Sequence, residues 1–142
     1  MASYWLIKSE PSAYPWSRLA KEGRTRWDGI RNFEARNYLR EMKVGDLCLF
    51  YHSNVGKEIV GVARVSRAPF ADPTAEEGDW TAIEIEPEYP LIQPVDLVAL
   101  KAAKSTAGME LITRSRLSVT KVTAVQWRAV HKMAKTNEKS TA

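Results

Sequence analysis

The stretch Tyr-Trp-Leu-Ile-Lys-Ser-Glu-Pro, residues 4–11, has the composition of a β-strand that ends at its proline. Aromatic and β-branched residues are enriched in strands, and proline lacks the backbone N–H that a strand ladder needs. Residues 46–53 have the pattern of a second strand, and an apolar run over residues 59–65 follows the turn signal of residues 54–56. The chain therefore opens with a strand and continues into a hairpin or near-hairpin.

Capping residues mark the ends of two helices in the first half of the chain. Pro15 suits the first turn of a short helix that runs to about Glu22, and Gly23 ends it. Asn32 can cap a second helix over residues 33–43, whose apolar and basic residues fall on separate faces.

The second half of the chain alternates strand patterns with loops. Thr123 and Gln126 form a capping box that opens a last helix. We expect loops over residues 24–32 and 68–78, the second because of its prolines and its acidic run. Further elements are expected as strands at residues 80–85 and 117–122, a strand or helix at 95–103, and a short apolar turn or strand at 109–112.

The length of 142 residues favours one domain with a single core. We expect this domain over residues 1–136 and a disordered tail over residues 137–142. Five or six short strands, with short helices and no regular strand–helix–strand order, favour an α+β fold. The expected architecture is a small β-barrel of mostly antiparallel strands with flanking helices.

Cysteine and histidine are scarce, with one and two residues respectively. These numbers exclude an internal disulfide framework and a multi-cysteine zinc site, and they supply a first-row metal centre poorly. The first apolar run, residues 4–7, is too short for a signal-peptide core or a membrane span. We expect a soluble, cytoplasmic, monomeric protein that uses no metal or other cofactor and binds no membrane.

Positive charge is concentrated in one segment. Residues 18–43 carry eight Lys and Arg and four acidic residues, whereas residues 72–96 carry eight acids and no Lys or Arg. One basic face on such a molecule suits a nucleic-acid backbone, and an ordinary solvated surface is the alternative. The candidates for phosphate contacts are Arg24, Arg26, Arg31, Arg36, Arg40 and Lys43.

The sequence contains no clear catalytic constellation. Cys48 lies inside an apolar strand pattern, where a buried and unreactive thiol is expected. His52 and Ser53 are adjacent on a strand and therefore point to opposite faces. Glu10 and Asp28 fit surface carboxylates better than an acid–base pair, and the glycines form no phosphate-binding loop pattern. We expect no catalytic residues.

Trp27 lies outside the periodic apolar runs that contain Trp5, Trp80 and Trp127. Its indole either offers a face on which a nucleobase stacks or plugs a gap between two helices. Polar residues at two strand ends, Lys8 with Ser9 and Ser53 with Asn54, supply donors and acceptors that suit a base edge.

Six blocks of sequence resemble the signature blocks of a known family, the EVE domain family. They are Tyr-Trp-Leu-Ile-Lys-Ser-Glu-Pro (4–11), Trp-Asp-Gly-Ile-Arg-Asn-Phe-Glu-Ala-Arg-Asn-Tyr-Leu-Arg (27–40), Lys-Val-Gly-Asp (43–46), Phe-Tyr-His-Ser-Asn (50–54), Val-Gly-Val-Ala (60–63) and Arg-Leu-Ser-Val (116–119). They occur in the family's order and span almost the whole chain. The resemblance implies the PUA-like fold, a small barrel with helices around it, and a relationship to the YTH readers of N6-methyladenine in RNA.

The resemblance also implies a pocket that accepts a flipped or unpaired modified base. Lys8, Ser9 and Trp27 carry over from the related readers, and Ser53 and Asn54 from the EVE pattern. Asp28 and Asn32 either flank the base that would stack on Trp27 or stabilise the expected loop over residues 24–32. The expected ligand-binding residues are Lys8, Ser9, Trp27, Asp28, Asn32, Ser53, Asn54, Arg116 and Ser118.

The expected function is therefore a nucleic-acid-binding module, not an enzyme, that recognises a modified base in DNA or RNA. The base is 5-methylcytosine, an oxidised derivative or a methylated RNA base. Two alternatives stay open: an enzyme or accessory factor acting on modified nucleotides, since fold does not fix function, and a protein-interaction domain with a vestigial pocket. The sequence departs from the family pattern over residues 78–95, at the expected rim of the groove.

Overall fold

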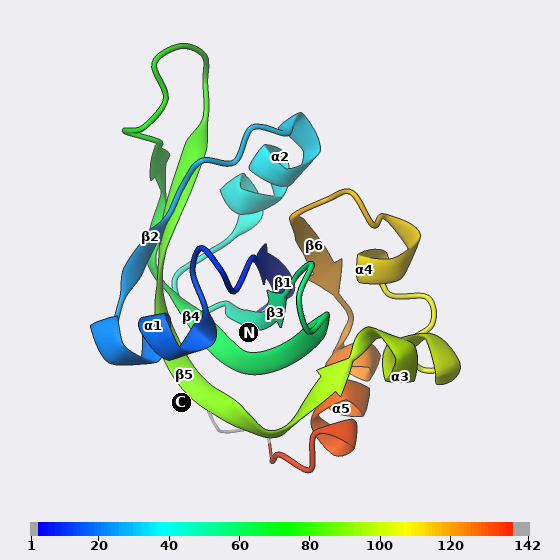
Figure 1. Cartoon of the computed structure of the whole chain (residues 1–142). Helices are drawn as coiled ribbons and strands as arrows, with labels where there is room; N and C mark the ends of the chain where they lie inside the picture. Colours follow the sequence, from blue (N-terminus) through cyan, green and yellow to red (C-terminus); the bar gives the residue numbers. More distant parts are fainter. Residues whose placement is uncertain (1–2, 138–142) are drawn as a thin grey trace.

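The computed structural model describes residues 3–137, which fold around one six-stranded sheet (Figure 1). Its strand order is β2-β5-β4-β3-β1-β6. Strands β1 and β3 run parallel, and the other neighbouring pairs are antiparallel. The strands are β1 (Tyr4–Ser9), β2 (Thr25–Trp27), β3 (Leu47–His52), β4 (Glu58–Ala71), β5 (Thr81–Asp96) and β6 (Val119–Val122).

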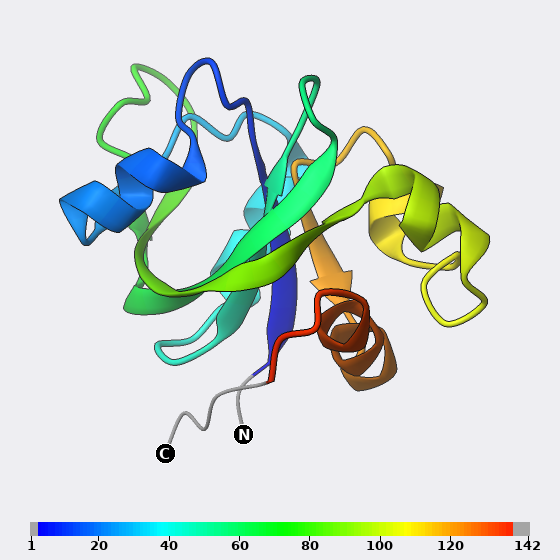
Figure 2. The same ribbon diagram turned by 60° about the horizontal axis from the view of Figure 1, so that its bottom comes forward.

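The sheet is strongly curled, and β4 and β5 carry most of its curvature (Figure 2). The ladder between these two strands shifts register at several positions, and such irregularities bend a strand and increase its twist. Strands β2 and β6 form the two edges of the sheet, and within residues 3–137 no pairing joins them. The expected α+β fold with mostly antiparallel strands and flanking helices is confirmed, as a curled sheet that does not close into a barrel.

Two apolar clusters pack on opposite faces of the sheet, because successive residues of a strand point to opposite sides. Ile7 of β1 belongs to a cluster with α1 (Trp16–Glu22) and α2 (Phe33–Glu41). Leu6 belongs to the other cluster, which the remaining helices cover. These are α3 (Leu97–Ala102), α4 (Glu110–Thr113) and α5 (Ala124–Met133). None of the helices in the described part of the chain is long and apolar enough to cross a membrane.

The helix ends predicted from capping residues are confirmed. Pro15 is the N-cap of α1, and Gly23 ends this helix with a φ of 81°, in the left-handed region that favours glycine. The Asn32 side chain accepts hydrogen bonds from two backbone N–H groups of α2. Thr123 and Gln126 form both halves of the capping box of α5.

Three predicted boundaries are wrong. Residues 24–32 are not all loop, because Thr25–Trp27 forms β2 and pairs with β5. Strand β4 continues to Ala71, into the expected loop, and β5 runs to Asp96 instead of ending near residue 85. Strands β4 and β5 are longer than predicted because the ladder between them is irregular. Bulges in such a ladder accommodate prolines that would break a regular strand. The predicted tail falls mainly on residues 138–142, which lie outside the described residues.

Candidate functional site

The carboxyl ends of the parallel strands β1 and β3 lie side by side, because Ser9 pairs with His52 in the ladder. Ser53 donates a backbone hydrogen bond to the Ser9 carbonyl at 2.9 Å. One residue further on, Asn54 Nδ2 donates to Glu10 Oε1 at 2.7 Å. The structure therefore brings Ser9, Ser53 and Asn54 together, as expected from their positions at strand ends.

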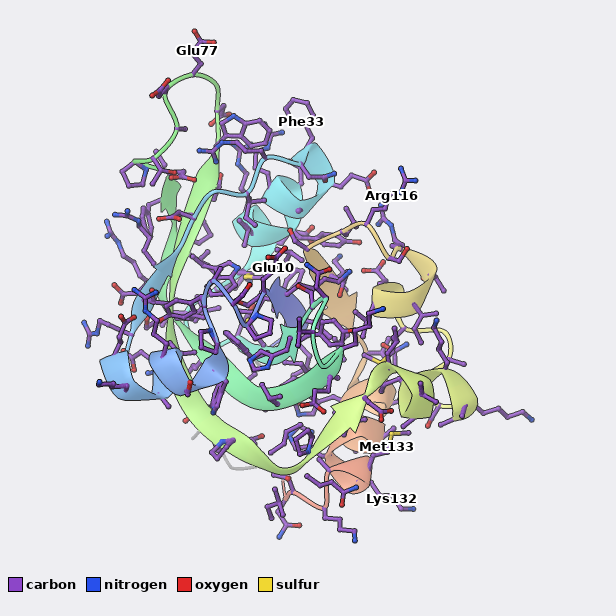
Figure 3. All side chains as sticks on the ribbon, in the orientation of Figure 1. Glu10, Phe33, Glu77, Arg116, Lys132 and Met133 are labelled. Carbon is purple, nitrogen blue, oxygen red and sulfur yellow. The ribbon has the colours of Figure 1, made fainter. Side chains whose placement is uncertain are left out.

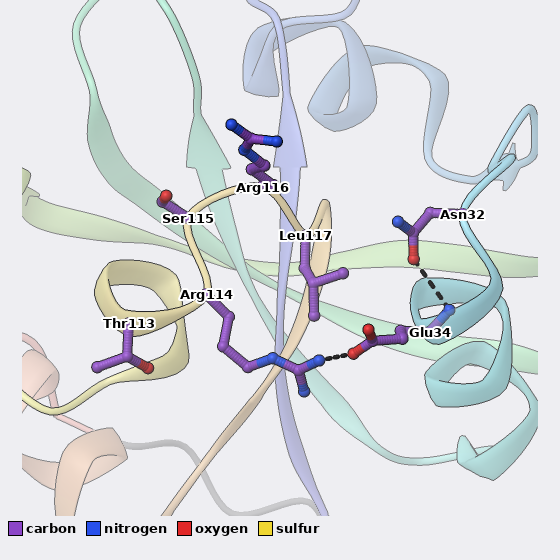
Figure 4. A pocket seen from close by; sticks show the side chains of 7 residues that line it. All are labelled: Asn32, Glu34, Thr113, Arg114, Ser115, Arg116 and Leu117. Carbon is purple, nitrogen blue, oxygen red and sulfur yellow. Dashed lines mark hydrogen bonds and ion pairs between the residues drawn. The ribbon is translucent and has the colours of Figure 1, made fainter.

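A pocket of about 460 Å3 opens near this end of β1, between the start of α2 and the segment that follows α4 (Figure 4). Its volume lies in the range of roughly 300–1,000 Å3 that is common for ligand sites. Three of its side chains are charged, and one is apolar and buried. The lining residues are Asn32, Glu34, Thr113, Arg114, Ser115, Arg116 and Leu117.

Asn32 has two separate roles at this pocket. Its Oδ1 accepts hydrogen bonds from the backbone N–H groups of Glu34 at 2.9 Å and Ala35 at 3.0 Å, which caps α2. The Nδ2 group is the other end of the amide, and in Figure 4 it points away from the cap. Because Asn32 lines the pocket, this amide can donate hydrogen bonds to a bound group.

The two walls of the pocket are linked by an ion pair. Arg114, after α4, pairs with Glu34 of α2 (Figure 4). Arg114 Nη1 also donates to the Tyr38 hydroxyl at 3.0 Å, and that hydroxyl donates to Glu110 Oε2 at 3.1 Å. These contacts hold the segment after α4 against α2 and thereby fix the width of the pocket.

Lys8 connects β1 to the segment that follows α4. Its ammonium donates to the Ser115 carbonyl at 2.7 Å, and burial lowers the pKa of Lys8 from its ordinary value. The backbone N–H of Lys8 donates to the Ser118 carbonyl at 3.0 Å. Arg116 is exposed and lines the pocket. Of the expected ligand-binding residues, Asn32 and Arg116 thus line this pocket, and Lys8 and Ser118 position its wall.

Trp27 lies apart from the pocket, inside an apolar cluster. Its side chain is only 8% exposed, and its ring packs edge-on against Tyr14 and Phe50, with ring centroids at 6.0 and 5.7 Å. The indole therefore fills the core, as the plug interpretation predicts, and a stacking role would require its neighbours to move. Ser9 Oγ donates to the Tyr14 carbonyl, and Asp28 pairs with Arg26 at 2.6 Å.

Residues 3–133 match the EVE domain family. The chain belongs to this family. Mouse thymocyte nuclear protein 1 is 34% identical in an alignment of 161 positions that covers 87% of this chain and 70% of the mouse protein. Among solved structures, a protein from Rhodopseudomonas palustris has a TM-score of 0.90 and 43% identity, with 94% of each chain covered. Human THYN1, crystallised with DNA that contains 5-methylcytosine, has a TM-score of 0.86 and 26% identity, with 96% of this chain and all of that chain covered.

Several basic residues of this EVE domain are paired with the acidic segment, which the charge pattern of the sequence did not predict. The acidic segment lies against the basic segment: Arg24 pairs with Glu86 at 3.6 Å and Arg40 with Asp79 at 2.7 Å. Arg36 Nη1 donates to the Asp79 carbonyl at 3.1 Å. The reason is topological, because β2 pairs with β5 and α2 contacts β5, so residues far apart in sequence meet.

Arg31 and Asp72 form the most buried of these ion pairs, at 2.9 Å, with no exposed surface on the Asp72 side chain. Burial alone would raise the pKa of Asp72. Hydrogen bonds from Thr74, Arg31 and the backbone N–H of Gly29 outweigh burial and hold the pKa well below its ordinary value. Asp72 therefore stays ionised and anchors the start of the loop between β4 and β5.

Cys48 is fully buried, as predicted, and burial together with Asp46 raises the pKa of its thiol well above the ordinary value. The backbone N–H of Trp16 donates to His52 Nε2 at 3.0 Å, and burial lowers the pKa of this histidine. Within residues 3–137, no group of three or more His, Cys, Asp or Glu side chains is placed to hold a metal ion.

Sequence reasoning missed the residues that fix the pocket walls, namely Glu34, Tyr38, Glu110 and Arg114. Their contacts span more than seventy residues between α2 and the segment around α4. Only the spacing of Glu110 and Arg114, four residues apart, gives a local signal of an interaction.

Proposed function

We propose that this EVE domain binds a strand of nucleic acid and recognises one modified cytosine, 5-methylcytosine or an oxidised derivative, in the pocket beside Asn32. The observation that carries the proposal is the pocket itself, which lies at the end of β1 and combines polar and apolar lining. The similarity to human THYN1, which was crystallised with 5-methylcytosine DNA, supports the same ligand class.

The lining matches the chemistry of a methylated cytosine. Glu34 offers carboxylate oxygens to an exocyclic amino group, the pairing typical of acidic residues and cytosine N4. Asn32 Nδ2 and the Arg116 guanidinium donate, which suits the ring nitrogen and carbonyl oxygen of the base or a flanking phosphate. Leu117, 5% exposed, is the apolar group that a methyl substituent can contact.

The same lining supports recognition without chemistry. Its titratable side chains are Glu34, Arg114 and Arg116, and Glu34 is paired with Arg114. Neither a thiol nor an imidazole is among the lining residues. A general acid or base needs a pKa tuned toward the working pH, and the Glu34 carboxylate is engaged by the Arg114 guanidinium. The domain is therefore expected to bind its ligand and leave it unchanged.

The test is a binding survey with short DNA and RNA strands that differ in one central base, measured at one stated salt concentration. Wild-type protein is expected to prefer the modified strand, and Arg116→Ala is expected to weaken that binding. Arg128→Ala, an equal change of charge on an exposed residue of α5, is the matched control. Mass spectrometry of the strand after incubation with the protein tests the enzyme alternative. Equal binding of all bases, or a chemically altered strand, contradicts the proposal.

A further inference from the structure

Two aromatic rings from distant parts of the chain stack on the surface beside the pocket. Phe33 is the first residue of α2, and Trp80 ends the loop between β4 and β5. Their ring centroids lie 5.1 Å apart with an interplanar angle of 16°. Phe33 is 64% exposed, so much of its side chain is open to solvent.

Two guanidinium groups lie over the same rings. Arg36 Cζ is 4.9 Å from the centroid of Phe33 and 5.8 Å from that of Trp80, and Arg31 Cζ is 5.5 Å from Trp80. We call these four residues, Phe33, Trp80, Arg31 and Arg36, the aromatic platform. Stacked rings with adjacent arginines are the combination that binds successive bases of a single strand.

The aromatic platform is fixed before any ligand arrives. Arg31 is held by the buried Asp72 carboxylate, and Arg36 by the Asp79 carbonyl. Gly78 has a φ of 89°, and a Cβ atom there would lie 2.7 Å from Trp80 Nε1, so the loop needs glycine for Trp80 to fold back onto it. Groups that are already ordered lose little entropy on binding.

The position of the platform sets the path of a bound strand. Asn32 and Glu34, on either side of Phe33 in sequence, both line the pocket, so the start of α2 connects the platform to the pocket. Figure 3 shows Glu77 at the tip of the loop between β4 and β5, pointing away from the molecule. Its negative charge disfavours a polyanion at the tip, which leaves the Phe33 side of the loop for the strand.

We propose that the aromatic platform is a second nucleotide position, on which the base next to the recognised one stacks in an unpaired DNA strand. This inference rests on the proposed function, because it assigns the neighbouring nucleotide of the same strand. Stacking on a ring is tolerant of base identity. The platform therefore contributes affinity for any unpaired strand, whereas the pocket contributes the preference for the modified base.

The experiment compares a short single-stranded DNA that carries one 5-methylcytosine with the same strand that carries cytosine. Phe33→Ala is expected to weaken binding of both strands by the same factor, about 5- to 150-fold, the range for stacking of one base. The preference between the two strands is expected to persist. Phe33→Trp should restore binding, and Ile92→Ala, which removes an apolar residue that is 75% exposed, should leave it unchanged. Thermal melting confirms that each variant is folded.

The outcomes separate the two proposals. If Phe33→Ala binds both strands as tightly as the wild type, the platform is not a nucleotide position, whatever the pocket does. If the wild type binds both strands equally and Phe33→Ala weakens both, the platform stands and recognition of the modified base is wrong. If the wild type binds neither strand, both proposals fail.

Discussion

Arg31 Nη1 lies 2.9 Å from Asp72 Oδ2, and this contact joins the basic and the acidic segments of the chain across 41 positions of sequence. The Asp72 side chain is completely buried, while that of Arg31 is 38% exposed. The carboxylate also accepts hydrogen bonds from Gly29 and Thr74. The pair therefore fixes the segment before α2 and the loop between β4 and β5 in one arrangement, and the aromatic platform depends on it.

Asp72→Asn should lower the free energy of unfolding at neutral pH by about 1–3 kcal/mol, because a buried network of charge-assisted hydrogen bonds is left incomplete. The pKa of Asp72 is depressed in the folded protein. The contribution of the ionised Asp72 carboxylate to the free energy of unfolding is therefore fully present above about pH 4, the unfolded-state pKa. It is lost as the pH falls toward the pKa of the folded state. Urea denaturation at a series of pH values should show that the free energy of unfolding falls less at acid pH in the variant than in the wild type.

Asp79→Asn is the matched control for this change. The Asp79 side chain is 81% exposed and pairs with Arg40, and exposed ion pairs contribute little to stability. In this variant the free energy of unfolding should fall at acid pH as much as it does in the wild type. An equal loss of pH dependence in both variants would show that net charge, and not the buried Asp72 carboxylate, controls acid unfolding.

Local sequence signals predicted the helix ends well. The caps at Asn32 and Thr123 depend on side chains within three residues of the helix start, so their chemistry is visible in the sequence. The length of β4 and β5 was not visible in this way. These strands continue through prolines because of bulges in their shared ladder, and a bulge depends on the partner strand.

The candidate site was predicted in part, for a related reason. Lys8 and Asn32 were expected from the family resemblance, and each also lies at or near the end of an element that the sequence defines. The ion pair of Glu34 with Arg114 was missed because it connects residues eighty positions apart. The pairing of Arg31 and Arg40 with acids was also missed, since a linear charge pattern does not show which segments meet in space.

Trp27→Ala should destabilise the protein by about 3–5 kcal/mol, because truncation of a buried aromatic side chain leaves a cavity. Trp127→Ala should have a similar effect, since Trp127 is 1% exposed in the other apolar cluster. Chemical denaturation measures both. If Trp27→Ala keeps wild-type stability but loses affinity for a modified strand, the indole is a stacking face and the plug interpretation is wrong.

Arg116→Ala should reduce the salt dependence of strand binding. Arg116 is exposed, lines the pocket and forms no ion pair within the described residues, so its charge is available to a phosphate. Each lost phosphate contact lowers the slope of log affinity against log salt by about one. Titrations at several salt concentrations test this, with Arg128→Ala as the control of equal charge. The same decrease in both variants would indicate a long-range effect of net charge.

Asn32→Ser separates the two roles of Asn32. Serine caps a helix about as well as asparagine, so the stability of α2 should be preserved, but the Nδ2 donor is removed from the pocket. The variant should therefore lose about 0.5–1.5 kcal/mol of binding, the contribution of one hydrogen bond, with little change in unfolding. Asn32→Ala removes both functions and should also lower the free energy of unfolding by about 0.5–2 kcal/mol. Titration with a modified strand and chemical denaturation measure the two effects independently. Wild-type affinity in Asn32→Ser would mean that Asn32 serves α2 alone and that the donor to the base lies elsewhere in the pocket.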